Sequence, residues 1–598
     1  MRLTLVLPRV LMTALALAAL GTACSSGSLT DARVMSLRLS LDPAFDTLFI
    51  SASPTAPLPT LKVTATATSM GNPIDLPSGH LFESANPAIA TIDQNGIVTG
   101  RALGVTTVSV RVNDERTSST IVVLSMVKSL TLSAAPTQAL VGDTIVLTAK
   151  LVGWDTLAVT GQPITYTSSS PSAVVSSTGR VVFTAPGTAT ITATSGPATA
   201  SVSLTAFARD FVGGSAFALA TGADATCGLA PLGRTFCFGK APLIGVARDT
   251  VCFDQSANGA SASAPCTLVG LQIAASIQLT ALAVGDNVAC GLVAGGSLYC
   301  WGDQAFGAVG NGVSRSGTSA LPVPVTGPLA QAATFTQVIA GGNHACGLIT
   351  GGQAYCWGKD LSLQLGGGDG IKANSSTPIP VYATYGYTFR ALAAGRGHTC
   401  GIRSDGATLC WGDNANGQLG RGTFGDTTET PVAIVGDPGF TQISARGDNT
   451  CGITAAGALY CWGANESGQT GQAASVRVTV PTQVAGAGYT AVSVGGRDST
   501  DTFGAVDHAC ALQGTAAVCW GSNVYGQLGR GGQPSVGGTT PAAVAGGHAF
   551  TAITSGTRTV CGFAADGVYC WGSSIFGATG SQVQALAITT PTRVAPLQ

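Results

Sequence analysis

The sequence predicts an all-β fold that is divided among several domains. The chain has 598 residues, too many to pack around one hydrophobic core. Glycine contributes 81 of them, about twice the usual share. Short alternating runs of Gly, Ala, Thr, Ser and Val favour strands and turns over helices. From Phe211 onward the chain also repeats itself, as a fold built of equivalent units does.

The charge content of the chain excludes two classes of protein. Asp, Glu, Lys and Arg make up 10% of the residues, and the formal net charge is −1, whereas about a quarter is the ordinary charged share. A protein that binds nucleic acid by neutralising phosphates needs a basic surface, so we expect no nucleic-acid partner. The 45% of apolar residues is enough to offset the entropy of the chain, which excludes a disordered protein.

The first 23 residues have the pattern of an export signal. Arg2 and Arg9 supply positive charge, residues 10–20 form an apolar run, and Gly21-Thr22-Ala23 is a small-residue cleavage site. The apolar run is too short to span a bilayer. We therefore predict that residues 1–23 are a signal peptide and that cleavage after Ala23 exposes Cys24.

Cys24 and its neighbours predict a lipid anchor. Residues 20–24, Leu-Gly-Thr-Ala-Cys, resemble a bacterial lipoprotein box, although the leucine stands one place too early. The resemblance implies lipidation at Cys24, with residues 24–33 as a lipidated tether that holds the protein at a membrane. The alternative is an ordinary signal peptide and a free Cys24. We expect an exported protein of the cell envelope, anchored at the outer membrane or cell surface, or else secreted.

Residues 34–125 and 126–207 each consist of short strands separated by turn residues, which predicts two β-sandwiches. In the first, Ser84-Ala85-Asn86-Pro87 leads to an alternating strand and then to glycine turns at Gly96 and Gly104; the second repeats this pattern more loosely. Both resemble the group-two bacterial immunoglobulin-like domains, with Phe82 where a tryptophan is usual. The resemblance implies a spacer role, with direct ligand binding as the alternative.

Seven pairs of cysteines mark seven repeated units after residue 210. In each pair the cysteines flank a glycine-containing turn, so they face each other across a hairpin, within disulfide reach. A zinc site needs about four ligands, and each hairpin offers two thiols, so disulfides are the better interpretation. The pairs are Cys227 with Cys237, Cys290 with Cys300, Cys346 with Cys356, Cys400 with Cys410, Cys451 with Cys461, Cys510 with Cys519, and Cys561 with Cys570.

The total of 17 cysteines is odd, and this bears on Cys24. Cys252 and Cys266 lie in an insertion of the first unit, where they can pair with each other. Eight bridges then leave only Cys24 unpaired. Because exported proteins rarely keep a free thiol, this parity independently favours a lipidated Cys24.

One unit carries the repeat most clearly, with His398-Thr399-Cys400-Gly401, then Cys410-Trp411-Gly412 and Gly417-Gln418-Leu419-Gly420. Six units contain Cys-Trp-Gly. This pattern resembles the regulator of chromosome condensation repeat. The resemblance implies a seven-bladed β-propeller over residues 211–598. Residues 590–595 match the strand that precedes the Phe-rich strand in the other units, so we expect this C-terminal strand to complete the first blade.

The sequence offers no pattern of catalytic residues. His344, His398 and His508 occupy the same position in separate units, so we interpret them as structural residues rather than as a metal site. Residues 413–417 look like part of a calcium loop but contain too few carboxylates, which favours a turn. No nucleophile elbow, phosphate loop or HExxH motif is present. We predict a protein without enzymatic activity, cofactor or metal; a catalytic propeller is the weakest alternative.

Aromatic residues gather in one sector of the predicted ring. The fifth residue after the repeat tryptophan is aromatic at Phe306, Tyr525 and Phe576, in the blades around blade one, and Phe253 lies in the insertion of blade one. These four residues are the candidate binding site for a protein or glycan. The alternative is that the rings pack into their own loops.

The predicted function is that of a monomeric cell-envelope lipoprotein whose propeller binds an extracytoplasmic protein or glycan. The eukaryotic namesake of the repeat acts on a small GTPase and on chromatin, partners that an exported chain does not meet. A secreted bacterial relative inhibits a β-lactamase through an aromatic face of its propeller. The alternative function is therefore a secreted proteinaceous inhibitor of an envelope enzyme, such as a β-lactamase or a penicillin-binding protein.

Overall fold

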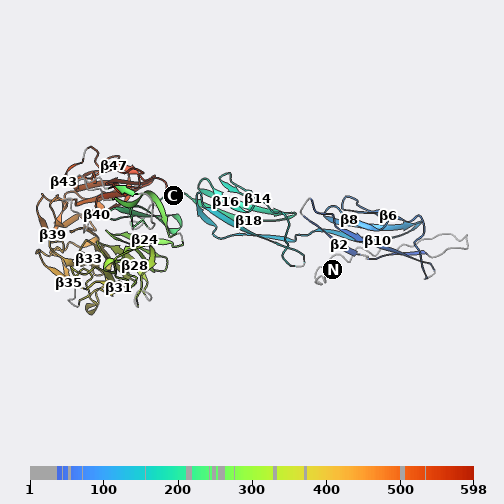
Figure 1. Ribbon diagram of the computed structural model, residues 1–598, viewed down its shortest axis with the longest axis horizontal. Helices are drawn as coiled ribbons and strands as arrows, with labels where there is room; N and C mark the ends of the chain where they lie inside the picture. Colours follow the sequence, from blue (N-terminus) through green and yellow to red (C-terminus); the bar gives the residue numbers. More distant parts are fainter. Residues whose placement is uncertain are drawn as a thin grey trace. The chain divides into compact units, whose positions relative to one another are not determined.

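The computed structural model is an all-β chain of two compact units, residues 1–208 and 209–598 (Figure 1). It describes residues 37–597 except 43–44, 52–54, 70–71, 155, 211–218, 242, 245–250, 254–262, 275, 328–332, 369–372, 498–505 and 533. The predicted signal peptide, Cys24 and the tether lie outside the described residues. Within the described part of the chain, no helix is long and apolar enough to cross a membrane.

The first unit begins with a β-sandwich of three sheets. One sheet has the order β2-β10-β9-β6, with β2 parallel to β10. Its strands are β2 (Phe45–Ile50), β6 (Leu81–Ser84), β9 (Gly104–Val112) and β10 (Glu115–Ser125). The other two sheets are β1-β4-β5 and β3-β8-β7. Their strands are β1 (Leu37–Asp42), β3 (Thr60–Lys62), β4 (Thr64–Ser69), β5 (Asn72–Ile74), β7 (Ala90–Ile92) and β8 (Ile97–Gly100).

The second sandwich repeats the first with two sheets, β11-β13-β16-β15 and β12-β18-β17-β14. Its strands are β11 (Ser129–Ala134), β12 (Gln138–Leu140), β13 (Thr144–Val152), β14 (Thr165–Ser168), β15 (Ala173–Val175), β16 (Arg180–Phe183), β17 (Gly187–Ser195) and β18 (Ala198–Phe207). As β2 does with β10, the short β12 runs parallel to β18. The two modules therefore share a four-stranded sheet in which the short first strand runs parallel to the last.

Alternation along the strands builds the core of each sandwich. In β9, Val108 and Val110 are fully buried, and they pack with Ile121 and Val123 of β10. Because successive side chains of a strand point to opposite faces, the residues between them face away from this core. Phe82, at the position where the related domains have tryptophan, is buried in the same core at 7% exposure.

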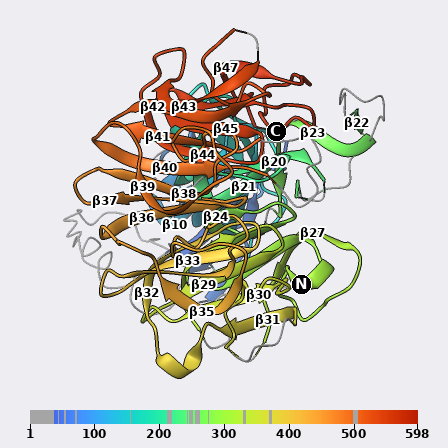
Figure 2. The same cartoon turned by 90° about the vertical axis from the view of Figure 1, so that its left-hand side faces the viewer.

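The second unit contains seven radial sheets, each a blade of a β-propeller (Figure 2). Blade one has the order β19 (Leu219–Thr221), β20 (Ala225–Ala230), β21 (Arg234–Lys240), β23 (Ser263–Ile273), β22 (Val251–Phe253). Blade two consists of β24 (Leu279–Val284), β25 (Val288–Val293), β26 (Leu298–Asp303) and β27 (Thr318–Pro324). Blade three consists of β28 (Phe335–Ala340), β29 (His344–Ile349), β30 (Ala354–Gly358) and β31 (Ser375–Pro380). Blade four consists of β32 (Phe389–Ala394), β33 (His398–Arg403), β34 (Thr408–Asp413) and β35 (Thr427–Ala433).

Blades five to seven have the same antiparallel order. Blade five consists of β36 (Phe440–Arg446), β37 (Asn449–Thr454), β38 (Leu459–Ala464) and β39 (Arg477–Gln483). Blade six consists of β40 (Tyr489–Gly495), β41 (His508–Gln513), β42 (Ala516–Asn523) and β43 (Ser535–Ala543). Blade seven consists of β44 (Phe550–Ser555), β45 (Thr559–Ala564), β46 (Gly567–Gly572) and β47 (Ile588–Arg593). The seven-bladed prediction is confirmed.

The predicted disulfides are confirmed in all eight pairs. In blade two, Cys290 of β25 lies directly opposite Cys300 of β26, and the turn between them uses the positive φ angles of Gly295 and Gly296. The seven hairpin pairs have Cα–Cα distances of 4.0–4.1 Å. The eighth joins β22 to β23 through Cys252 and Cys266, whose Cα atoms are 5.8 Å apart.

The hairpin disulfides recur at one position in all seven blades, where the second strand of the blade faces the third. Besides Cys290 and Cys300, the bonded pairs are Cys227 with Cys237, Cys346 with Cys356, Cys400 with Cys410, Cys451 with Cys461, Cys510 with Cys519, and Cys561 with Cys570. All of these cysteines are at most 1% exposed. Each disulfide is therefore part of the core of its blade.

A buried tryptophan ties each blade from two to seven to the blade before it. The indole Nε1–H of Trp411 donates to the carbonyl of Gln364, a loop residue of blade three, at 3.0 Å. The other five do the same at 2.9–3.0 Å: Trp301 to Leu243, Trp357 to Ala308, Trp462 to Gln418, Trp520 to Gln469 and Trp571 to Gln527. The repeated Cys-Trp-Gly motif is thus the connection between blades.

The closure of the ring differs from the predicted strand exchange. β47 pairs with β46, so the C-terminal strand completes blade seven and not blade one. The expectation was wrong because the matched segment is the outer strand of its own blade. At this junction Phe238 replaces the tryptophan and packs against Gly580, while the Thr226 hydroxyl donates to the Ala578 carbonyl at 2.8 Å. A threonine therefore makes the inter-blade hydrogen bond that phenylalanine lacks.

Candidate partner-binding face

Two sets of loops form one face of the propeller. Because the strands of a blade alternate in direction, the connection after its first strand and the connection after its third strand lie at the same end. We call this end the loop face. Its inner part comprises residues 222–224, 285–287, 341–343, 395–397, 446–448, 496–497 with 506–507, and 556–558. Its outer part consists of the loops that follow each Trp-Gly.

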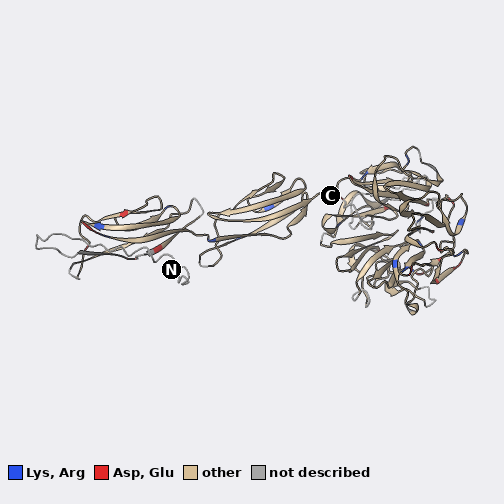
Figure 3. Cartoon of the chain, turned by 180° about the vertical axis from the view of Figure 1, so that it is seen from behind, with Lys and Arg blue, Asp and Glu red and all other residues tan. Residues whose placement is uncertain are grey.

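Most of the propeller is tan in Figure 3, because charged residues are few in this chain, but the inner part of the loop face carries several that are buried. Five charged side chains in this inner part are less than 9% exposed: Asp286, Arg446, Asp448, Asp507 and Arg558. A buried charge needs a partner of opposite sign. These residues meet that need by pairing with one another and with their neighbours across blade boundaries.

Arg446 crosses the centre of the ring. It ends β36 in blade five, and its guanidinium donates to the Asp286 carboxylate of blade two at 2.7 Å. The same group donates to the carbonyl of Thr221 in blade one at 3.2 Å. The side chain is 8% exposed, and these contacts link blade five to blades one and two on the other side of the ring.

The position of Arg446 explains why sequence reasoning missed it. The equivalent residue is glycine in the other six blades: Gly222, Gly285, Gly341, Gly395, Gly495 and Gly556. A Cβ added at Gly395 would lie 2.1 Å from the ring of His398. Blade five has Asn449 in place of that histidine. Two features of the sequence could have revealed this arginine. It stands where the other six units have glycine, and its own unit has asparagine where three other units have histidine.

Further pairs extend the network around the mouth of the channel. Arg396 contacts Asp448 at 2.9 Å, and Arg558 lies 4.0 Å from Asp224. The backbone N–H of Arg497 donates to Asp507 at 2.7 Å. Burial raises the pKa of Asp507 to about 6, and burial also raises the pKa of Asp448. The inner part of the loop face is therefore a network of paired charges of both signs.

The repeat histidines are structural, as the sequence predicts. His344 and His398 are fully buried, and their Nε2 atoms lie 3.0 and 2.8 Å from the hydroxyls of Thr399 and Thr450 in the following blades. His508 contacts the Val506 carbonyl at 3.2 Å. Burial lowers the pKa of these three rings to about 4, 3 and 4. Among the described residues, no group of His, Cys, Asp or Glu side chains is arranged to hold a metal ion.

The calcium-like segment of blade four is a turn. The Asp413 carboxylate accepts from the Ala415 N–H at 3.0 Å, and the Asn414 carbonyl oxygen of the side chain accepts from the Leu419 N–H at 3.2 Å. Asn465 makes the equivalent bond to Thr470, and Asn523 to Leu528. These side chains satisfy backbone groups of their own loops.

The structure brings two of the four predicted aromatic residues together and buries both. Tyr525 and Phe576 are 8% and 4% exposed and pack with the Cys252–Cys266 disulfide and Val506. Their rings are covered because the stapled strands β22 and β23 lie over this sector, which corrects the expectation that they face a partner. Phe306 is half-buried, with the Lys359 ammonium 5.3 Å from its ring centroid. The side chain of Phe253 lies outside the described residues.

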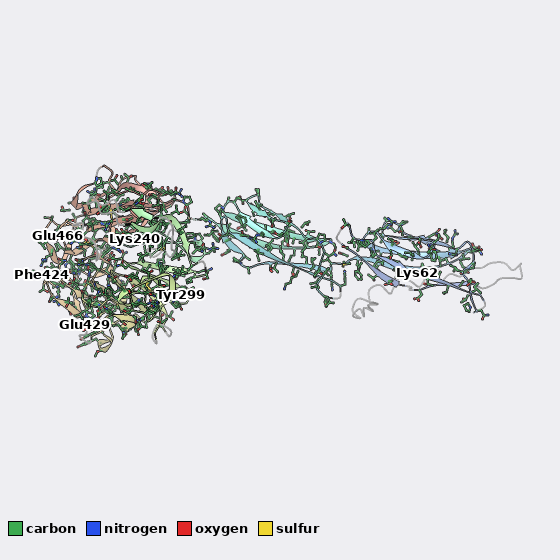
Figure 4. The ribbon with its side chains drawn as sticks, in the orientation of Figure 1. Lys62, Lys240, Tyr299, Phe424, Glu429 and Glu466 are labelled. Carbon is green, nitrogen blue, oxygen red and sulfur yellow. A yellow bond between two sulfur atoms is a disulfide. The ribbon has the colours of Figure 1, made fainter. Side chains whose placement is uncertain are left out.

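Other residues provide the accessible part of the loop face. Leu361 of blade three and Val524 of blade six are 51% and 44% exposed, in the loops that follow Trp-Gly. Glu466 pairs with Arg497 at 3.1 Å, and both are partly exposed; Figure 4 labels Glu466 on the left-hand side of the propeller. The loop face thus presents exposed apolar side chains together with a partly exposed ion pair, which suits the recognition of a protein surface.

Comparison with known families matches parts of the propeller and of the first sandwich. The model of the regulator of chromosome condensation (RCC1) repeat matches residues 295–348, 405–453 and 456–500, and a second model of the repeat matches 389–418 and 440–469. Residues 295–348 and 389–500 of the propeller thus contain RCC1 repeats. Residues 60–123 match the bacterial Ig-like domain of group 2. The disulfides and this bacterial Ig-like domain indicate an extracellular protein.

Several known proteins are similar to the RCC1 propeller. The ultraviolet-B receptor UVR8 of Arabidopsis thaliana is 26% identical over 50% of this chain and 66% of its own length. The human E3 ubiquitin-protein ligase HERC2 is 27% identical over 45% of this chain and 5% of its own length. The chain thus spans less than two thirds of both relatives.

Two solved structures show the same fold. Human WBSCR16 has a TM-score of 0.51 and 21% identity, covering 60% of this chain and 94% of its own. Prp20p of Saccharomyces cerevisiae has a TM-score of 0.50 and 20% identity, covering 65% and 88%.

Proposed function

We propose that this protein displays its RCC1 propeller outside the cytoplasm and binds a protein partner through the loop face. The observation that carries the proposal is the preorganised centre of this face, where buried ion pairs hold Arg446, Asp448 and Asp507 in place. Rigid charged groups bordered by exposed apolar residues favour a specific and oriented protein complex. The structural study of Prp20p describes its binding to Gsp1p and histones, an example of the repeat in protein binding.

The proposal includes no catalytic step. The charged groups of the loop face are engaged with one another, and the disulfides and histidines have structural partners. The two Ig-like modules act as spacers between the propeller and a lipid anchor at Cys24. The alternative is a secreted inhibitor that uses the same face against an envelope enzyme such as a β-lactamase or a penicillin-binding protein.

Changing Leu361 and Val524 to glutamate tests the loop face. The exposed side chains make no core contact, so the double variant folds, but it buries two new charges in any complex. Partners are captured from envelope extracts with the full, oxidised chain, and affinity for each captured protein is measured after purification. We expect at least tenfold weaker binding, because an unpaired charge at an interface costs well over about 1.4 kcal/mol.

The matched control is Val435→Glu, an equally exposed change at 51% in the loop between β35 and β36, at the opposite end of the blade. It should bind normally. The proposal is wrong if the control weakens binding as much as the double variant, or if the double variant binds like the unmodified chain.

The lipid anchor is tested by intact mass spectrometry of the membrane-associated protein. We expect the mass of the chain from Cys24 onward plus a diacylglyceryl group, and release of a Cys24→Ser variant from the membrane fraction. A membrane-free protein that begins at Cys24 without added mass would instead support the secreted inhibitor.

A further inference from the structure

The loop between β31 and β32 carries three tyrosines whose rings lie nearly parallel. The ring centroids of Tyr382 and Tyr385 are 4.7 Å apart with an interplanar angle of 11°. Tyr387 lies 5.8 Å from Tyr385 at 24°, and 6.3 Å from Tyr382 at 21°. We call these three residues the tyrosine platform. It lies at the end of blades three and four that is opposite to the loop face.

The backbone of this loop is shaped so that the rings meet. Residues Ala383–Tyr385 form a 3-10 turn, in which the Tyr385 N–H donates to the Tyr382 carbonyl at 3.2 Å. In such a turn the side chains at i and i+3 eclipse, which puts Tyr385 on Tyr382. Gly386, at φ +59°, then reverses the chain and returns Tyr387 to the same side.

Tyr382 itself is held in an unfavourable backbone conformation. Its φ is +39°, a region that non-glycine residues rarely adopt. The Tyr382 N–H donates to the Gly366 carbonyl at 2.8 Å, and its ring packs on Gly368, where an added Cβ would approach the ring to 2.6 Å. Local strain that is maintained by surrounding contacts is a feature of functional sites.

The platform leaves one ring open to solvent. Tyr385 is 62% exposed, whereas Tyr382 and Tyr387 lie beside it. Because one face of the Tyr385 ring lies on its neighbours, the exposed area belongs to the opposite face and the edge. Fold stability does not demand this arrangement, since the equivalent connection of blade five is Ala485-Gly486-Ala487-Gly488.

Charged side chains border the rings. The Arg403 guanidinium lies 5.0 Å from the centroid of Tyr387 and pairs with the Asp405 carboxylate at 2.8 Å. Both side chains are partly exposed, at 33% and 54%. A planar donor, a carboxylate acceptor and a flat aromatic face are thus presented together on the surface.

We propose that the tyrosine platform binds a β-linked pyranose chain. A pyranose with equatorial hydroxyls has flat faces of C–H groups, which pack on an aromatic ring, and a rim of hydroxyls that both donate and accept. Arg403 supplies donors and Asp405 supplies acceptors for that rim. A purely apolar partner would leave this ion pair unused or bury it at a desolvation cost. The site is separate from the loop face and extends the proposed function with a glycan contact.

Calorimetric titration of the full chain with cellohexaose and chitohexaose tests the proposal. We expect at least one hexasaccharide to bind, Tyr385→Ala to weaken that binding at least tenfold, and Tyr385→Trp to retain it within threefold because the flat face is kept. Phe424→Ala, which removes another exposed ring at 58% exposure, should change the affinity by less than twofold. Figure 4 labels Phe424 on the left-hand side of the propeller.

Three outcomes overturn the proposal: neither hexasaccharide binds, Tyr385→Ala binds as well as the unmodified chain, or decaproline replaces the sugars as the Tyr385-dependent ligand. Since Tyr385 is exposed, its variants keep the thermal transition of the unmodified chain, and a shifted transition would be detected by tryptophan fluorescence. The Leu361→Glu, Val524→Glu variant should bind sugar normally, so failure of the glycan site and failure of the loop face are distinguishable.

Discussion

Replacing Arg446 with alanine should destabilise the propeller by about 3–5 kcal/mol, the usual cost of removing one member of a buried ion pair. The guanidinium that joins blade five to Asp286 of blade two and to the Thr221 carbonyl of blade one would be lost. Urea unfolding of the full chain measures the effect. Tryptophan fluorescence is the appropriate probe, because six of the seven tryptophans are in the propeller.

Two further variants show whether the ion pair causes the loss of stability in Arg446→Ala. Arg446→Met combined with Asp286→Leu removes both charges and keeps most of the volume, so it should recover most of the stability. Arg421→Ala breaks the more exposed pair with Asp426 and should cost less than about 1 kcal/mol. If Arg446→Ala costs no more than Arg421→Ala, the guanidinium does not hold the ring together.

Acidification should destabilise the propeller as the pH falls from 6.5 towards 4. His344, His398 and His508 have folded-state pKa values of about 4, 3 and 4 because of burial, below the value of about 6.5 for an unfolded chain. In this window the unfolded state binds more protons than the folded state. The contribution of these three buried, neutral histidines to the free energy of unfolding is therefore present above pH 6.5 and is lost as the pH drops.

Asp507 acts in the opposite direction. Burial raises its folded-state pKa from 3.8 to about 6, so its contribution is present at low pH and is lost as the pH rises through 6. Each pKa unit corresponds to about 1.4 kcal/mol. Asp448, whose pKa burial also raises, acts in the same direction as Asp507. Because three buried histidines outnumber these two carboxyls, the net effect of acid is destabilising.

The measurement is the midpoint of thermal unfolding at pH values from 7.5 to 4. His398→Asn, which introduces the residue that blade five carries at Asn449, should reduce the slope of the midpoint against pH. A midpoint that stays constant down to pH 4 would contradict the prediction.

Local patterns were sufficient for the repeated parts of this fold. Cys290 and Cys300 face each other because a hairpin with a glycine turn is defined within a dozen residues, and Phe82 could be placed in a core by its match to a known domain. The structural role of His398 followed from its repetition in other units. In each case the partners are near in sequence or are copied from blade to blade.

The tertiary structure alone decided the features that break the repeat. Arg446 meets Asp286 across 160 residues, and nothing local shows that blades five and two approach the same centre. The same holds for β47, whose blade is set by the closed ring, and for Tyr525 and Phe576, which β22 and β23 cover. Short-range periodicity specifies strands and hairpins, whereas burial and charge pairing across a ring depend on its closure.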